Sequence, residues 1–254
     1  MSLHIACSKR QELVKALALP KSFHQRPLPP LCIAFASVDG RKLFQEALSG
    51  SYMHIYFPLA EQFTTQTEPS FCGLTTLVMC LNALRMDPGR PWKSAWRWYS
   101  EEMLDCACAS VAVVKEKGIS LPEFVALAKC QGLVALETRA TAALTLDVFR
   151  TVVRASCATS SEVLVVNYSR KTFEQTGDGH FSPIGGYNAA SDMVLLMDVA
   201  RFKYPPHWVS LPLLLQSMQQ IDASSGLPRG YVLLKQGPTT LCMAPPDSNQ
   251  AMER

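Results

Sequence analysis

The sequence predicts an α+β domain, because segments with helical periodicity come first and segments typical of strands come last. The helical segments lie between residues 38 and 155, and the strand-like segments lie between 162 and 235. A chain that forms a parallel sheet would instead alternate strands with helices. We therefore expect a helical N-terminal half that packs against an antiparallel sheet.

The chain opens with an extended segment that leads into a helix. Residues 26–38 are rich in proline and then apolar, which indicates an extended entry with a short strand or loop. Ser37 or Asp39 then opens the first helix, and Gly50 ends it.

The next helix carries a cysteine near its start. Pro69 precedes it, Ser70 is the expected N-cap, and Asp-Pro-Gly at 87–89 ends it. The apolar residues of this helix recur at helical spacing and form one stripe: Leu74, Leu77, Val78, Leu81 and Leu84. Cys72 is therefore expected in the first turn.

Three more helices and four strands are expected along the rest of the chain. The helices cover 92–104, 121–131 and about 145–155. The strands are EVLVVNY, HFSPIGGYN, MVLLMDVA and GYVLLK, and the AASD at 189–192 joins the middle two as a hairpin.

The helix expected at 92–104 holds a cluster of tryptophans among basic residues. The cluster comprises Trp92, Trp96, Trp98 and Tyr99, beside Arg90, Lys93 and Arg97. Basic and aromatic residues together could stack nucleic-acid bases. Aromatic residues at helical spacing are more typical of core packing, and we interpret them in that way.

Length and composition indicate one domain with two flanking segments. The chain has 254 residues, 48% of them hydrophobic. We expect the domain over 24–236, a basic N-terminal extension over 1–23 and a disordered tail over 237–254. The extension lacks the apolar core of a secretory signal, so we expect a cytoplasmic protein, with an organelle transit segment as the alternative to a basic surface helix.

Neither nucleic acid nor a membrane is expected as a partner. The net charge of +3 is too small to support an electrostatic argument for either. The chain also lacks an uncharged apolar run of about 18 residues, the length that spans a bilayer.

The cysteines indicate free thiols in a reducing compartment. There are nine, an odd number, and no secretory signal accompanies them. Cys106 and Cys108 form the only close pair, and two sulfurs alone make an incomplete metal site. We interpret them as thiols near solvent, with contact to an activating metal ion as the alternative, and we expect Cys80 in the core.

The position of Cys72 suggests a nucleophile. The first turn of a helix presents unpaired N–H groups and the positive end of the helix dipole, which lower a thiol pKa and favour the thiolate. A cysteine in an apolar helix is often only a small core residue. The assignment therefore depends on finding a base elsewhere in the chain.

His180 is the best candidate for that base. It lies between a glycine turn and an amphipathic strand, although a histidine at a strand edge is often structural. The predicted hairpin brings Asp198, at the end of the partner strand, within about three residues of the position opposite His180. A carboxylate at the end of an apolar strand needs a partner, and the alternative to His180 is Arg201.

Gln66 completes the set of candidates. Its side-chain amide and the Cys72 backbone N–H could together stabilise a developing oxyanion, worth about 3 kcal/mol per donor. Glutamine, cysteine, histidine and aspartate in this order, with the cysteine opening a helix and the histidine on a strand, are typical of papain-like enzymes.

Four long blocks of this sequence resemble the phytochelatin synthase family. The blocks are TQTEPSFCG, NALRMDPGRPWKSAWRWYSEEMLDC, GHFSPIGGYN and DVARFKYPPHW, and RPLPP and DGRKLFQEAL also fit. The resemblance covers about residues 24–235. It implies a papain-like fold and a glutathione γ-glutamylcysteinyltransferase.

The resemblance also implies a reaction and its residues. The cysteine attacks the Cys–Gly bond of glutathione, glycine leaves, and γ-glutamylcysteine passes to glutathione or to a growing (γGlu-Cys)n-Gly peptide. Heavy-metal ions such as Cd, Zn and Cu stimulate the enzymes of the family, and they act as thiolate complexes of the substrate glutathione. The reaction serves to detoxify these metals. Matching motifs make Cys72 the nucleophile, His180 the acid/base and Asp198 its orienter, with Gln66 in the oxyanion hole.

Two more residues are assigned a substrate role by the resemblance. Arg201 matches a residue associated with the γ-glutamyl unit, and Glu68 is placed to meet its α-amino group. Plant members carry a long cysteine-rich C-terminal region, and this chain has only a short tail. A glutathione hydrolase is therefore an open alternative. A non-catalytic metal-binding thiol protein is the alternative from another class, and a homodimer is left open.

Overall fold

A computed structural model describes residues 22–105 and 110–237 of the chain. Its strands are β1 (Ile33–Ala34), β2 (Leu133–Arg139), β3 (Glu162–Ser169), β4 (Gly179–Asn188), β5 (Met193–Leu196), β6 (His207–Ser210), β7 (Ile221–Asp222), β8 (Leu227–Pro228) and β9 (Gly230–Gln236). Its α-helices are α2 (Val38–Ser49), α3 (Tyr56–Glu61), α4 (Cys72–Ala83), α5 (Val111–Lys117), α6 (Leu121–Cys130), α7 (Leu146–Cys157) and α8 (Leu211–Met218). Two 3₁₀ helices are η1 (Glu101–Leu104) and η2 (Arg170–Phe173).

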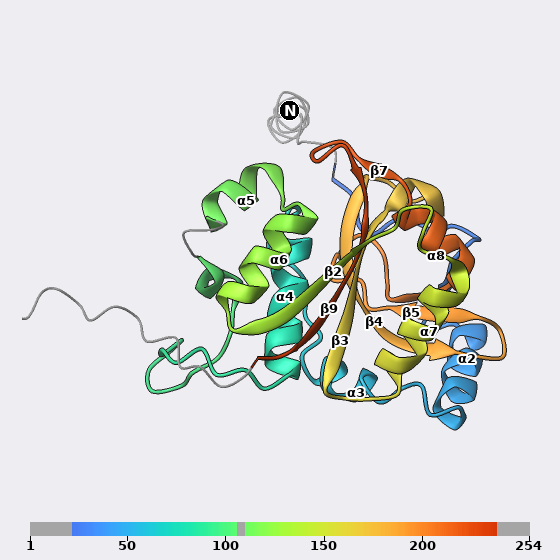
Figure 1. The fold of residues 1–254 in the computed structure, drawn as a ribbon, viewed down its shortest axis with the longest axis horizontal. Helices are drawn as coiled ribbons and strands as arrows, with labels where there is room; N and C mark the ends of the chain where they lie inside the picture. Colours follow the sequence, from blue (N-terminus) through green and yellow to red (C-terminus); the bar gives the residue numbers. More distant parts are fainter. Residues whose placement is uncertain (1–21, 106–109, 238–254) are drawn as a thin grey trace, which may run out of the picture.

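Within the described residues, seven strands form one antiparallel sheet in the order β1-β6-β5-β4-β3-β9-β2. The remaining pair, β7 and β8, forms a small separate ribbon. Helices α4 and α6 cover one face of the large sheet, and α7 and α8 cover the other (Figure 1). Helix α2 packs against Leu195 and Trp208, whose side chains point away from α7 and α8. The α+β class predicted from the sequence is confirmed.

Strand β3 shows why both faces of the sheet are apolar. Because side chains alternate along a strand, Val163 and Val165 join the core beneath α4 and α6, whereas Leu164 and Val166 join the core beneath α7 and α8. All four side chains are fully buried. A strand covered on both sides reads as a continuous apolar run, as EVLVVNY does.

Helix α4 lies deeper than its single apolar stripe predicts. Every residue from Gly73 to Ala83 is buried, because the sheet, α3, α6 and η1 surround the helix. The predicted N-cap is also wrong. Phe71 occupies the cap position without a side-chain hydrogen bond, and the Ser70 hydroxyl instead donates to the backbone oxygen of Lys115 at 2.9 Å.

The predicted hairpin is confirmed and fixes the register of the two central strands. Asn188 pairs with Met193, and the turn between them includes Asp192 in the left-handed region at φ +51°. Strand β5 ends at Leu196, earlier than predicted. The Met197 N–H still donates to the Pro183 oxygen at 3.1 Å, so the chain follows β4 as far as the next residue, Asp198.

The helix predicted at 92–104 is wrong over most of its length. Only the last four residues are helical, as η1, and Lys93 and Trp96 form an isolated β-bridge before them. Pro91 and the positive φ of Ser94 (+51°) interrupt the backbone there. Trp96 is 76% exposed and Trp98 is 43% exposed, so they do not pack in the core.

The other predicted helices are confirmed with small shifts in their ends. Ser37 caps α2 by accepting from the Gly40 N–H, and Gly50 follows the last turn. Helices α6 and α7 match the predicted segments, and Cys80 is fully buried as expected. Within residues 22–105 and 110–237, every helix is too short or too polar to cross a membrane.

Several predictions fall outside the described residues. This group comprises residues 1–21 of the extension predicted over 1–23, residues 238–254 of the tail predicted over 237–254, and the pair Cys106 and Cys108.

Candidate active site

Cys72 is the first residue of α4, the buried central helix. The orphan N–H groups of the first turn lack a side-chain cap, so their partial positive charge is directed at the sulfur. Gly73 allows this helix start to pack closely, because a Cβ atom there would overlap Cγ2 of Ile119. The glycine after the cysteine is therefore a requirement of packing.

His180 and Asp198 meet where the sequence predicts. The histidine is the second residue of β4, and its Nε2 lies 2.8 Å from Oδ1 of Asp198, just beyond β5. Nδ1 is then the ring nitrogen available to Cys72, with which His180 also forms a hydrogen bond. Histidine and aspartate side chains are both buried, and both line or adjoin the cleft described below.

Arg170 is the residue of this group that the sequence analysis missed. Its Nη2 donates to both carboxylate oxygens of Asp198, at 2.9 and 2.7 Å, and its side chain is only 3% exposed. The Ala200 N–H also donates to Asp198, at 2.8 Å. Arg170 comes directly after the apolar β3 strand and beside Lys171, so the sequence does not distinguish it from an exposed basic residue at a strand end.

The four charges shift one another's ionisation. Burial raises the pKa of Cys72, but the His180 charge, hydrogen bonds from His180 and Phe181, and the Arg170 charge outweigh it and lower the pKa. Burial and Arg170 lower the pKa of His180, but Asp198 and Cys72 raise it overall. Burial opposes ionisation of Asp198 as well, yet His180 and Arg170 hold its pKa far below the ordinary value. The arrangement favours a thiolate–imidazolium pair.

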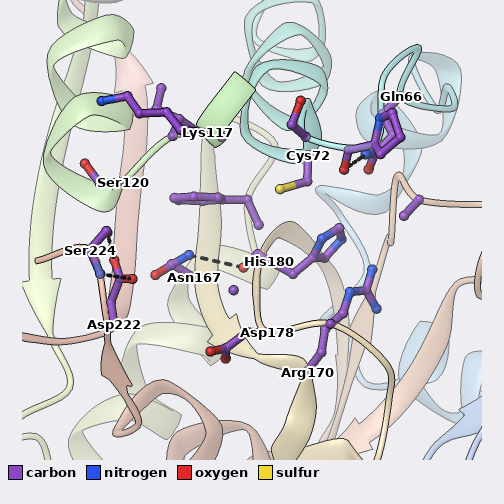
Figure 2. A pocket seen from close by; sticks show the side chains of 18 of the residues that line it. Gln66, Cys72, Lys117, Ser120, Asn167, Arg170, Asp178, His180, Asp222 and Ser224 are labelled. Carbon is purple, nitrogen blue, oxygen red and sulfur yellow. Dashed lines mark hydrogen bonds between the residues drawn. The ribbon is translucent and has the colours of Figure 1, made fainter. Parts of the chain in front are cut away.

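Cys72 and His180 open into a cleft of about 900 Å³. Figure 2 shows the cysteine above the histidine and Arg170, with Lys117 and Ser120 on one wall and Asp222 and Ser224 below them. The walls come from residues 115–120 and 222–225. A peptide of a few residues fits a cleft of this size.

One end of the cleft carries paired opposite charges. Arg229 is buried, with its Nη atoms 3.3 Å from Asp178 and 3.7 Å from Asp222. Its Nε atom is buried and lacks a hydrogen-bond partner among the described residues. Gly179 permits the approach of Arg229, because a Cβ atom there would meet the guanidinium at 2.5 Å. The sequence analysis did not select Arg229, Asp178 or Asp222.

Gln66 lines the cleft, although its amide is engaged elsewhere. Nε2 donates to the backbone oxygens of Glu68 and Pro69, at 2.8 and 2.9 Å, and so holds the loop before Cys72. Oε1 is buried without a partner in the described part of the chain. Its role in an oxyanion hole stays a prediction.

Arg201 and Glu68 lie away from the reacting groups. The Arg201 guanidinium is 4.8 Å from the centre of the Phe63 ring, and it lines a neighbouring hollow of about 370 Å³. Glu68 forms an ion pair with Lys115 at 2.6 Å. Their predicted roles in binding substrate are therefore not matched by a position in the cleft. Asp198 takes His180 and Arg170 as partners, rather than Arg201.

The sequence predicts no metal site in the described part of the chain. Among residues 22–105 and 110–237, His, Cys, Asp and Glu side chains do not gather in groups of three or more that could hold a metal ion.

Comparison with known proteins identifies the family of this chain. The sequence model of phytochelatin synthase matches residues 23–231. The chain belongs to the phytochelatin synthase family. This confirms the resemblance predicted from the four sequence blocks.

Similar curated proteins carry one name. The chain is 48% identical over 217 residues to the glutathione gamma-glutamylcysteinyltransferase of Schizosaccharomyces pombe, covering 85% of this chain and 52% of the relative. It is 50% identical over 214 residues to glutathione gamma-glutamylcysteinyltransferase 1 of Arabidopsis thaliana, covering 84% and 44%. The chain spans about half the length of the curated relatives it matches.

Proposed function

We propose that this phytochelatin synthase family member is a papain-like cysteine acyltransferase that transfers γ-glutamylcysteine from glutathione. Cys72, His180 and Asp198 are its triad. The observation that supports the proposal is that Cys72 and His180 line the same cleft of about 900 Å³, with His180 Nε2 2.8 Å from Asp198. The names of the relatives supply the substrate.

The first half of the reaction forms a thioester. The Cys72 thiolate attacks the carbonyl carbon of the Cys–Gly bond, and the π electrons move to the oxygen. N–H groups at the start of α4 stabilise that oxyanion. His180 then gives its proton to the departing amine, and glycine leaves.

The second half returns the enzyme to its starting state. The neutral His180 accepts a proton from the amine of a second glutathione or of a growing peptide, and that amine attacks the thioester. γ-Glutamylcysteine passes to the acceptor, and the Cys72 thiolate and the imidazolium are restored. Gln66 Nε2 donates to two backbone oxygens in the free enzyme. Gln66 contributes to the oxyanion hole when Nε2 releases one of them and donates to the oxyanion instead.

Recognition of the γ-glutamyl unit is placed on Arg229 and Asp222. That unit ends in an α-carboxylate beside an α-ammonium group, and the paired charges in the cleft are complementary to both. Arg201 and Glu68, proposed for this task on the resemblance, lie outside the cleft lining. Cadmium and similar ions enter this scheme as thiolates of the substrate glutathione.

The decisive experiment replaces the nucleophile. Cys72→Ser is expected to fold and to release no glycine from glutathione, because a serine hydroxyl stays protonated at neutral pH. Cys130→Ser, which changes an exposed thiol, is the matched control and should keep full activity. Glycine release by the Cys72→Ser protein would refute the assignment.

Product analysis separates the remaining functions. Mass spectrometry after incubation with glutathione and cadmium should reveal (γGlu-Cys)n-Gly oligomers. Free γ-glutamylcysteine and glycine without oligomers would identify a hydrolase instead. Cadmium uptake that survives Cys72→Ser, with no turnover by the unaltered protein, would identify a metal-binding protein.

A further inference from the structure

The polar chain of the site continues behind Asp198. Arg170 donates through Nη1 to Oε1 of Gln175, and Gln175 Nε2 lies 3.2 Å from Nε2 of His207. His207 Nδ1 lies 2.9 Å from the backbone oxygen of Pro205. Gln175 and His207 are almost completely buried, and neither lines the cleft. The reaction mechanism above does not use them.

The order of donors and acceptors along this chain permits only one arrangement. A backbone oxygen can only accept, so His207 must carry its proton on Nδ1 and accept at Nε2. Gln175 must then present its NH₂ group to His207, which leaves Oε1 for the Arg170 guanidinium. If the amide turned over, its NH₂ group would face the N–H donors on Nη1 of Arg170. His207 thus selects the orientation of Gln175 that Arg170 requires.

The position of Arg170 decides the charge of the site. Thiolate and carboxylate contribute two negative charges, and imidazolium and guanidinium contribute two positive ones, so the buried group is neutral overall. If the guanidinium moves away, one negative charge is left uncompensated, and Cys72 or Asp198 must take up a proton. Figure 2 shows Arg170 next to His180, beneath Cys72.

We propose that Gln175 and His207 are positioning residues that hold Arg170 against Asp198 and thereby keep Cys72 ionised. This inference rests on the proposed function for the reaction that the thiolate performs. The residues act through Arg170 and do not touch substrate. Cys32, whose sulfur is 3.7 Å from Gln175 Nε2, is a neutral neighbour because burial raises its pKa to about 12.

The test measures ionisation of Cys72 without using the transferase reaction. The unaltered protein is alkylated with iodoacetamide across a pH series, and mass spectrometry of the Cys72 peptide gives the rate at that thiol alone. Gln175→Leu removes the hydrogen bonds to Arg170 and His207, and the weak one to Cys32, at nearly constant volume, and the alkylation midpoint should rise by about 1 pH unit. Turnover of glutathione at neutral pH should fall about tenfold.

Two further variants keep the test decisive if Gln175→Leu does not fold. His207→Gln supplies an amide oxygen that can still accept from Gln175, so its midpoint should stay near that of the unaltered protein. His207→Leu supplies no acceptor, so its midpoint should rise. Asn188→Leu is the matched control, since Asn188 is a buried amide that bonds Leu43 and Glu46 far along β4.

The outcomes are distinct. A raised midpoint in the leucine variants, with none in His207→Gln or Asn188→Leu, supports the proposal. Lower melting temperatures with unchanged midpoints would show that the two residues only stabilise the fold, and would overturn it. If the midpoint rises in the leucine variants but the unaltered protein releases no glycine from glutathione, the proposed function is refuted and the positioning role stands.

Discussion

Replacing Arg170 by methionine is expected to destabilise the protein strongly. The substitution keeps an unbranched side chain and removes the guanidinium that contacts both oxygens of Asp198 at 2.9 and 2.7 Å. Because Asp198 is fully buried, it would retain a charge with only His180 and one backbone N–H as partners. Breaking one side of a buried ion pair costs about 3–5 kcal/mol.

The expected loss can be measured as a coupling energy. A change of 3–5 kcal/mol in the free energy of unfolding corresponds to a fall in melting temperature of about 10 °C for a domain of this size. The double variant Arg170→Met, Asp198→Asn removes both charges, so its loss should be smaller than the sum of the two single losses by at least about 2 kcal/mol. Urea unfolding of the four proteins gives this difference directly.

A surface ion pair provides the comparison for this cycle. Arg97 and Asp87 form a similar two-point contact, but both side chains are more than half exposed. Screening by water should leave their coupling too small to measure. A coupling energy between Arg170 and Asp198 that is no larger than the coupling energy of the surface pair would refute the argument that Arg170 compensates a buried charge.

Two other predictions concern the nucleophile. Since the pKa of Cys72 is lowered and that of His180 is raised, the active ion pair exists between the two values, so glycine release should rise with pH as Cys72 ionises and fall as His180 loses its proton. An alkylation midpoint for Cys72 at or above that of a free thiol, about 8.5, would contradict this. Gly73→Ala forces a methyl group into Ile119, so we expect a loss of about 1–3 kcal/mol in stability and a lower turnover number. The double variant Gly73→Ala, Ile119→Ala should recover both the stability and the turnover number. If it is as impaired as Gly73→Ala alone, the loss does not come from overlap with Ile119.

The hairpin explains why the His180–Asp198 pair was predictable. A short turn fixes the register of the strands beside it, so two residues eighteen positions apart can be placed near one another across the hairpin from local sequence alone. The cysteine at a helix start is an equally local feature. Both predictions depended on short-range geometry.

Arg170 and Arg229 were not predictable in that way. Arg170 follows β3 and Arg229 precedes β9, and both side chains reach residues brought near by the order of the sheet. A basic residue at a strand end is most often exposed, so only tertiary placement distinguishes these two. The burial of α4 likewise depends on η1 and α6. They pack on sides of the helix that lie outside the apolar stripe predicted from the sequence.

The tryptophan segment was misread because spacing alone does not make a helix. Trp92, Trp96 and Tyr99 recur at helical intervals, yet Pro91 and the turn at Ser94 set the local backbone. Ser70 failed as a cap for a related reason. Its hydroxyl bonds Lys115 from α5, a partner 45 positions away.

Strand β4 occupies the middle of the large sheet, and its residue His180 pairs with Tyr168 of β3 while the imidazole bonds Asp198, just beyond β5. The opposite boundary of the cleft is formed by two short connections, one between α5 and α6 and one between β7 and β8. Changes in peptide preference are therefore expected to arise by exchanging those connections between homologues. Such exchanges would change which peptides are accepted and would leave Cys72, His180 and Asp198 in place.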